Sequence, residues 1–225
     1  MLEGFSPNDL NALQLTLKVS FYATFFAFVI GVAFAWVLAH FRFPGKNLLD
    51  AILTLPMVLP PTVLGYYLLV LFGRRGTFGP WLEDNLGIHL VFTWQGAVVA
   101  ATVVAFPLVF KSARAAFEDV EKNLEYAART LGSSGIGVFF RISLPLAVRG
   151  ITAGTLLAFA RAMGEFGATL MLAGNLPGRT QTLSMAVYDA VQAGDDVRAN
   201  ALVLLISVVC VTVLAVSGYY LAPKH

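Results

Sequence analysis

Long runs of apolar residues alternate along this chain with short polar segments. The runs cover about residues 13–39, 48–72, 94–110, 145–172 and 199–221. Each is long enough to cross about 30 Å of hydrocarbon as a helix, and none shows the period-two alternation of barrel strands. Because a helix satisfies its own backbone hydrogen bonds in lipid, the pattern predicts an all-α integral membrane protein with about five transmembrane helices. We expect residues 1–225 to form a single transmembrane domain.

Two segments between the runs are amphipathic. Residues 181–193 predict a short, weakly apolar helix that is either re-entrant or spanning. Residues 111–144 are charged and prone to form helices. There Val120, Leu124, Ala127, Ala128 and Leu131 recur at steps of three and four residues, which predicts one apolar stripe. Glu125 and its charged neighbours fall on the other faces, and Gly132 and Gly135 predict a break. Such a helix either binds another protein or lies on the membrane surface.

Composition supports a membrane location, because 58% of the residues are hydrophobic and only 12% are charged. A soluble domain carries roughly twice that charged fraction. A net charge of +2 gives no reason to expect a nucleic-acid partner. Basic residues gather near Arg42 and Lys46 and again between Lys111 and Arg149. By the positive-inside rule these mark the cytoplasmic side, so the N-terminus is expected outside and the C-terminus in the cytoplasm.

Prolines and one charge pair interrupt the apolar runs. Pro56, Pro60 and Pro61 predict a kink in the second run, and kinked helices often line transport pathways. Thr62 and Gly65 then become pore candidates, although a kink needed only for packing is the alternative. Farther along, Arg161 and Glu165 stand four residues apart in the fourth run. They predict either a paired charge with a structural or gating role or a pair that merely stabilises the helix.

Three arginines, Arg74, Arg75 and Arg179, fall on the expected outer side. They are candidates for steering an anion or for docking an external binding protein, and ordinary solvated charges are the alternative. Lys18 in the first run is expected to reach the outer surface, and no function is assigned to it.

Several chemistries find no support in the sequence. It contains no Gly-x4-Gly-Lys-Ser/Thr motif, so it lacks the phosphate-binding loop of ATPases. His40, His89 and His225 are scattered, and Cys210 stands alone in an apolar run, so no metal site is expected. No grouping typical of nucleophilic catalysis is present. We therefore expect no enzyme and no cofactor bound by this chain.

The segment around Gly132 resembles the cytoplasmic "EAA" loop of the permease subunits of ABC importers. That loop reads Glu-Ala-Ala, three residues, Gly, nine residues, Ile-x-Leu-Pro. Ala127, Ala128 and Gly132 match its first part at the same spacing. Ile142, Leu144 and Pro145 match its end. The family's glutamate position holds Tyr126, with Glu125 one residue earlier. Other short motifs, among them Leu55-Pro-Met-Val-Leu-Pro-Pro61 and Gly164-Glu-Phe-Gly-Ala168, resemble those of molybdate permeases, whose close relatives carry sulfate or tungstate.

The resemblance implies a type I ABC importer permease fold and a homodimer in a bacterial-type inner membrane. Cytoplasmic P-loop ATPase subunits would bind inside and carry the ATP, while a binding protein would deliver a tetrahedral oxyanion outside. Molybdate is the expected oxyanion, with sulfate or tungstate as alternatives, and a stand-alone secondary transporter is the less favoured reading. The implied ATPase-coupling residues are Glu125, Tyr126, Ala127, Ala128, Gly132, Ile142, Leu144 and Pro145.

Overall fold

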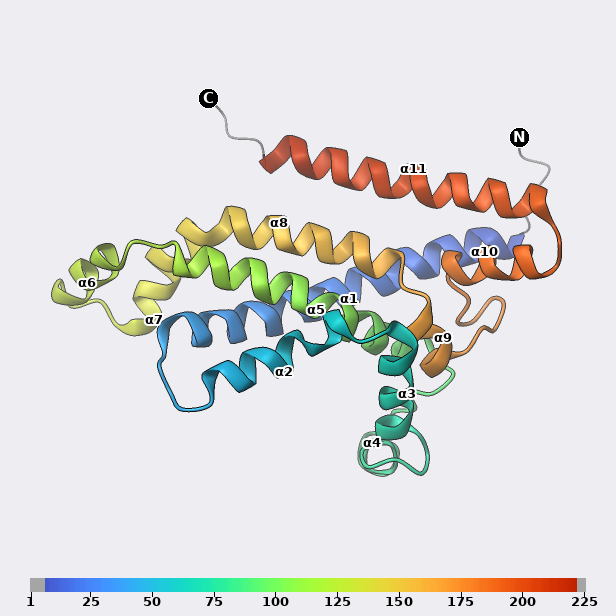
Figure 1. Ribbon diagram of the computed structural model, residues 1–225, viewed down its shortest axis with the longest axis horizontal. Coiled ribbons are helices and arrows are strands. Elements are labelled where there is room, and N and C mark those ends of the chain that lie inside the picture. Colours follow the sequence, from blue (N-terminus) through green and yellow to red (C-terminus); the bar gives the residue numbers. More distant parts are fainter. Residues whose placement is uncertain (1–6, 222–225) are drawn as a thin grey trace.

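The computed structural model describes residues 7–221, which form eleven α-helices and one short π-helix with no strand among them. Figure 1 shows the long helices side by side along the longest axis, with α6 at one end and α4, α9 and α10 towards the other. In chain order they are α1 (Pro7–His40), α2 (Lys46–Val58), α3 (Pro61–Phe72), α4 (Gly79–Leu86), α5 (Trp94–Glu118), α6 (Lys122–Thr130), α7 (Gly135–Val138), η1 (Phe139–Ser143), α8 (Leu144–Met163), α9 (Gly167–Ala173), α10 (Leu183–Gln192) and α11 (Asp196–Leu221).

The described helices confirm an all-helical membrane protein. Four helical segments are long and apolar enough to span a bilayer, namely Asn8–His40, Trp94–Glu118, Gly135–Met163 and Asp196–Ala215. A fifth candidate is the pair α2 and α3, which bends by 114° at its break. By length and composition, residues 7–221 therefore contain four candidate spans, or five if the bent pair is one span.

Two of the expected runs differ from the helices observed. The run 48–72 is not one span helix, because Leu59 and Pro60 are extended and Pro61 begins a new helix in a different direction. Proline lacks the N–H that would continue the helix and disfavours helical backbone in the residue before it. The run 145–172 also breaks, because α8 ends at Met163 and α9 starts at Gly167. In contrast, α5 continues beyond residue 110 to Glu118.

Helix α5 forms the centre of the bundle, because it packs against α1, α2, α8 and α9. Its buried positions carry many small residues, among them Ala97, Ala101, Ala105 and Ala113. On α8, Gly150 and Gly154 face it: a Cβ at Gly154 would lie 2.4 Å from the Ser112 side chain, and one at Gly150 would lie 2.7 Å from that of Ala116. Small residues four apart allow such close backbone approach in membranes.

Replacing Gly154 by leucine is expected to lower the stability of the folded chain by about 1–3 kcal/mol, because the added side chain overpacks the α5–α8 contact. The measurement is thermal unfolding of the purified protein in detergent. Gly218→Leu is the matched control, since nothing lies within 4 Å of a Cβ at that position. Equal melting temperatures for the two variants would contradict the packing role of Gly154.

Candidate functional site

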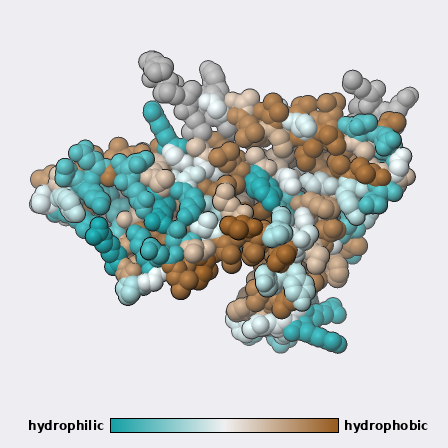
Figure 2. Space-filling view, in the orientation of Figure 1, coloured by the Kyte–Doolittle hydropathy of each residue, from teal (hydrophilic) through white to brown (hydrophobic). Residues whose placement is uncertain are grey.

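The segment from α6 to α7 projects from one end of the bundle and exposes apolar side chains. Leu131 is 87% exposed, Ile136 72% and Tyr126 59%. Ala127 and Gly132 are exposed beside them. Of the predicted apolar stripe, only Val120 is buried. Figure 2 shows that hydrophilic residues otherwise gather at this end. We call Tyr126, Ala127, Leu131, Gly132 and Ile136 the apolar docking surface.

Glu125 faces the protein, Ala127 lies on the far side of α6, and Tyr126 stands between them at the edge of the helix. The Glu125 side chain is buried, which corrects the expectation that it belongs to an outer polar face. His40 Nε2, at the end of α1, lies 2.8 Å from Glu125 Oε1, and the Ser143 hydroxyl donates to the same oxygen at 2.6 Å. His40 Nδ1 also lies 3.0 Å from the carbonyl oxygen of Trp36. Both ring nitrogens thus face acceptors, and both bonds form together only when the ring carries two protons.

The environment of Glu125 favours its charged form. Burial by itself would raise the pKa of this carboxyl, but the hydrogen bonds from His40 and Ser143 and the positive charges of His40 and Arg129 hold the pKa below its usual value. A charged Glu125 therefore joins α6 to α1 and to the start of α8 at neutral pH. The docking surface is presented by a helix fixed from behind.

Apart from the contacts of Glu125, a cleft separates α6 from the bundle. The cleft, of about 1090 Å³, lies between α6 and the ends of α1 and α5. Arg42, Lys46 and Lys122 line it together with Glu125 and Tyr126. Because the cleft separates the helix from the bundle over most of its length, the Glu125 contacts carry much of its attachment.

Gly132 ends α6 in a turn that requires its lack of a side chain. Its φ is +87°, a left-handed conformation that costs little only for glycine or asparagine. The N–H of Ser133 donates to the Ala128 carbonyl at 3.0 Å, and the N–H of Gly132 to the Arg129 carbonyl at 3.0 Å. These two bonds form a Schellman motif, which turns the chain sharply towards α7.

The end of the EAA-like segment lies at the base of the projection rather than at its surface. Ile142 and Leu144 are partly buried, and Leu144 packs against the main core. Pro145 was expected to begin a span, but the backbone is already helical from Gly135. Pro145 has no N–H to bond four residues back, and directly before it the helix widens into the π-helix η1, where the N–H of Leu144 donates to the Phe139 carbonyl. This widening contains Ser143, the partner of Glu125.

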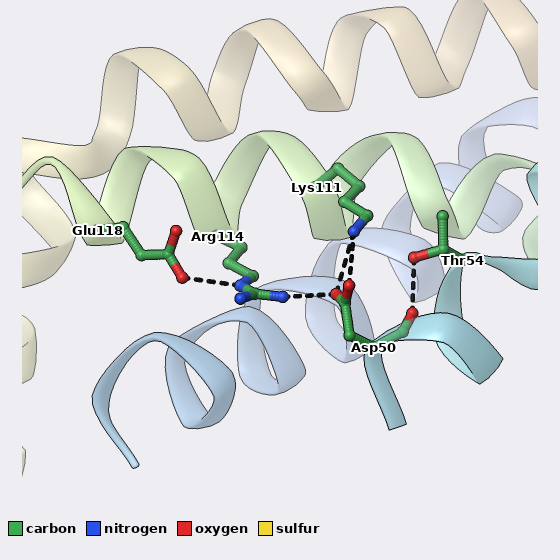
Figure 3. Close-up of polar contacts among 5 residues, drawn as sticks. All are labelled: Asp50, Thr54, Lys111, Arg114 and Glu118. Atoms are coloured by element: carbon green, nitrogen blue, oxygen red, sulfur yellow. Dashed lines mark hydrogen bonds and ion pairs between the residues drawn. The ribbon is translucent and has the colours of Figure 1, made fainter. Parts of the chain in front are cut away.

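An ionic cluster joins α2 to α5 nearby (Figure 3). Lys111 Nζ lies 2.9 and 3.1 Å from the two carboxylate oxygens of Asp50, and Arg114 Nη1 binds one of the same oxygens. Arg114 Nε also donates to Glu118 at 2.8 Å. Two cations and two carboxylates thus neutralise one another where α2 meets α5. Sequence analysis did not identify Asp50, because its partners are 61 and 64 residues away.

The predicted pair Arg161 and Glu165 forms where α8 gives way to α9. Arg161 Nη1 lies 2.8 Å from Glu165 Oε2, but the N–H is not aligned for a hydrogen bond, so the contact is an ion pair. The other carboxylate oxygen accepts the Ala168 N–H at 2.8 Å, in the first turn of α9. Glu165 is 2% exposed, whereas the Arg161 side chain is 35% exposed. Glu165 therefore fixes the break between the helices, and Arg161 compensates its charge.

The residues predicted around the kink divide into two groups. Pro60 and Thr62 are exposed, and Pro56 and Pro61 are partly buried. Gly65 is buried in the contact between α3 and α9, where a Cβ would lie 2.6 Å from that of Met171. Gly65 is thus a packing residue within this chain. Of the pore candidates near the bend, Thr62 and Pro60 are the ones that face outward.

The three predicted outer arginines are exposed at the end opposite α6. Arg74 and Arg75 lie between α3 and α4, and Arg74 lines a hollow of about 460 Å³ that also contains Glu83 and His89. Arg179 lies apart from them, in the loop between α9 and α10, where it lines a hollow beside α1. In the part of the chain that the structure describes, no three metal-binding side chains come together; His225 lies outside it.

Comparison with known proteins defines the class. Residues 27–224 match the family described as "Binding-protein-dependent transport system inner membrane component", and the chain belongs to this family of multi-pass inner-membrane permeases. It is therefore a transport component rather than an enzyme.

Among curated relatives, the chain is 48% identical over 205 residues to the molybdenum transport system permease protein ModB of Escherichia coli (strain K12), covering 90% of each chain. It is 35% identical over 201 residues to the sulfate transport system permease protein CysT of the same organism, covering 89% of this chain and 72% of that one. The solved MetNI methionine ABC transporter in inward facing conformations matches 94% of both chains with a TM-score of 0.72 at 20% identity. The last match shows the type I importer permease fold.

Replacing Glu125 by alanine is expected to loosen α6, because His40 and Ser143 lose the acceptor that ties them to it. Loss of such bonds costs about 1–3 kcal/mol, which corresponds to roughly 5- to 150-fold faster amide exchange in residues 122–130. Hydrogen–deuterium exchange with mass spectrometry measures this. Glu121→Ala, an exposed glutamate at the start of α6, is the control. Since the folded-state pKa of Glu125 is lowered, the protection is present at neutral pH and is lost as the pH falls through that lowered value.

Replacing Asp50 by asparagine is expected to destabilise the chain by about 1–3 kcal/mol, since Lys111 and Arg114 would keep their charges without a shared carboxylate. Thermal unfolding in detergent measures the effect. Arg114 keeps Glu118 as a partner, so the double variant Asp50→Asn with Lys111→Met removes the one charge left without a carboxylate and is expected to recover part of the loss. Strict additivity of the two substitutions would show that the ion pair contributes nothing.

Proposed function

We propose that this chain is the membrane-spanning permease of an ATP-driven importer that takes up molybdate. The observation that carries this proposal is the 48% identity, over 90% of both chains, to a molybdenum transport system permease. The sulfate permease relative is less similar, which makes sulfate the second candidate. Tungstate has the same shape and charge as molybdate and is expected to share its pathway.

In this proposal the apolar docking surface binds a cytoplasmic P-loop ATPase subunit, which holds the ATP, and the chain itself binds no cofactor. A covered partner surface explains why α6 turns its apolar side chains away from its own protein and its carboxylate inward. Movement of α6 then reaches α1 through His40 and α8 through Ser143, so both spans follow the ATPase. Coupling of this kind requires packed contacts between rigid elements.

The proposed orientation places α6 in the cytoplasm and the N-terminus outside. The basic residues Arg42, Lys46, Lys122, Arg129 and Arg141 support it, because all of them lie at the α6 end. The opposite end then faces an extracytoplasmic binding protein, with Arg74, Arg75 and Arg179 available to contact that protein or the anion.

A second copy of the chain is the proposed partner within the membrane. Figure 1 shows α3 and α4 leaving the bundle at a steep angle, so that they form an arm. The arm exposes aromatic side chains, namely Tyr66, Tyr67, Phe78 and Trp81. Pairing of two copies around this face would cover it and place Thr62 and Pro60 near a shared pathway. A stand-alone secondary transporter is disfavoured, because the docking surface would then have no purpose.

Transport by reconstituted vesicles tests the proposal. We expect ATP-dependent molybdate uptake only when the ATPase subunits and the binding protein are present, with strong competition by tungstate and weak competition by sulfate. In the same assay, a transporter with Gly132→Val is expected to hydrolyse ATP but to take up at least about tenfold less molybdate per ATP. Valine is strained at a φ of +87°, so the turn that ends α6 and shapes the docking surface is distorted. Gly132→Asn, which tolerates that conformation, is the matched control. Full coupling in the valine variant, or uptake by the permease alone, would contradict the mechanism.

A further inference from the structure

We propose that a hollow between α1 and the α9–α10 loop binds a tetrahedral oxyanion on the extracytoplasmic side, with Lys18 and Arg179 as its cationic ligands. The hollow measures about 280 Å³, and Asn11, Gln14 and Gln181 also line it. The proposal rests on the function proposed above and adds a binding position to it.

The two cations in this hollow have no compensating charge. No aspartate or glutamate lines it, and neither Lys18 nor Arg179 forms an ion pair with any residue in the described range 7–221. Three basic residues elsewhere in the helices do have an acidic partner: Arg198 binds Asp9, Arg161 binds Glu165, and Lys111 binds Asp50. A site with two unpaired positive charges attracts a dianion, and the exposed side-chain amides of Asn11 and Gln14 supply neutral N–H donors.

Asp189, an acid that contacts the loop, already has partners within the protein. Asp189 on α10 accepts hydrogen bonds from the amides of Asn175 and Gln181, one at each carboxylate oxygen. Both of its carboxylate oxygens are therefore engaged in holding the loop, and its side chain does not line the hollow. The carboxylate supports the site from behind rather than occupying it.

Both walls of the hollow are held in place. The Lys18 ammonium lies 3.7 Å from the centre of the Trp94 ring at the start of α5, a cation–π contact beside the hollow that restrains the Lys18 side chain. On the other wall, the Thr180 hydroxyl donates to the Gly174 carbonyl and accepts the Leu176 N–H, each at 3.1 Å. The buried Thr16 hydroxyl, half a turn from Lys18, accepts the Leu183 N–H at 2.8 Å and joins α1 to α10. Because the side chains that would bind the anion are already held in place, less free energy is lost in ordering them on binding.

The location suits an anion on its way into the membrane. In Figure 1 the first half of α1 and the α9–α10 loop lie at the end opposite α6, which is the extracytoplasmic end in the proposed orientation. Lys18 and Arg179 are both exposed, so an oxyanion can enter the hollow from the aqueous side and leave it again. A transport site must release its ligand, and partial exposure limits the affinity.

Equilibrium dialysis of molybdate against the assembled transporter tests the site. The permease with its ATPase subunits is placed in nanodiscs of phosphatidylcholine, without binding protein or ATP, and bound molybdenum is measured by elemental analysis. We expect Lys18→Gln and Arg179→Gln each to weaken molybdate binding at least about tenfold, because each removes a charge-assisted hydrogen bond. Lys18→Arg and Arg179→Lys keep the charge and are expected to stay within a few-fold of wild type. Arg149→Gln removes an exposed charge at the other end and is the control.

Several results would overturn the site. They are absence of molybdate binding to the wild-type transporter, wild-type affinity in either glutamine variant, and loss of binding in the Arg149 control. A site for lipid phosphate would give a different result in nanodiscs that contain phosphatidylglycerol. The glutamine substitutions would then reduce retention of this lipid and leave molybdate binding unchanged. If the variants weakened only the affinity for the binding protein, the two residues would be docking contacts.

The uptake assay separates this site from the proposed function. ATP-driven molybdate uptake by a wild-type transporter that binds no molybdate in dialysis would leave the function standing and remove the site. Dialysis binding that depends on Lys18 and Arg179, in a transporter that imports only sulfate, would retain the hollow as an oxyanion site and refute molybdate as the cargo.

Discussion

Close backbone approach to α5 is the constraint on which the rest of the structure depends. Lipid chains are as apolar as leucine, so burying leucine between two helices in a membrane gains little over leaving it in lipid. Dispersion contacts between backbones that come near each other provide the attraction instead, and these need small side chains. The alanines of α5 and the glycines at 150 and 154 of α8 supply them. The long helices can then keep large apolar side chains such as Phe21, Phe25 and Phe26 for the lipid.

Polar side chains have a different task in this bundle, which is to fix the places where helices break or meet. Glu125 joins three helical segments, Asp50 joins α2 to α5, and Glu165 holds the first turn of α9 where α8 ends. Each carboxylate is partnered by groups that the low dielectric makes costly to leave alone. Apolar faces can slide past one another at small cost, whereas these junctions have defined partners. Any conformational change is therefore expected to move the helices as units between fixed junctions.

The sequence predicted the features that depend on local pattern. The helical character of the apolar runs, the bend at the prolines and the break at Gly132 all follow from residues within a few positions of one another. It did not predict the partners of Asp50, which lie 61 and 64 residues away, or the break at residues 164–166, where Arg161 and Glu165 had been placed one turn apart on a continuous helix. The direction of Glu125 was missed for another reason. An apolar stripe is normally assumed to face its own protein, and here it faces outward, as a surface meant for a partner does.

The two ends of the molecule are connected by α1, which runs without a break from Pro7 to His40. Lys18 lines the proposed anion hollow, and His40 holds the carboxylate behind the docking surface. The two residues are separated by about 33 Å at 1.5 Å per residue. A helix packed along α5 by small residues is stiff, so displacement of its inner end by α6 is expected to shift its outer end too. Thr16 ties α1 to α10, and Gln181 ties the Arg179 loop to α10, so such a shift would move Lys18 and Arg179 together and displace the hollow as a unit. An anion bound between them would then sense the state of the cytoplasmic end through a single helix.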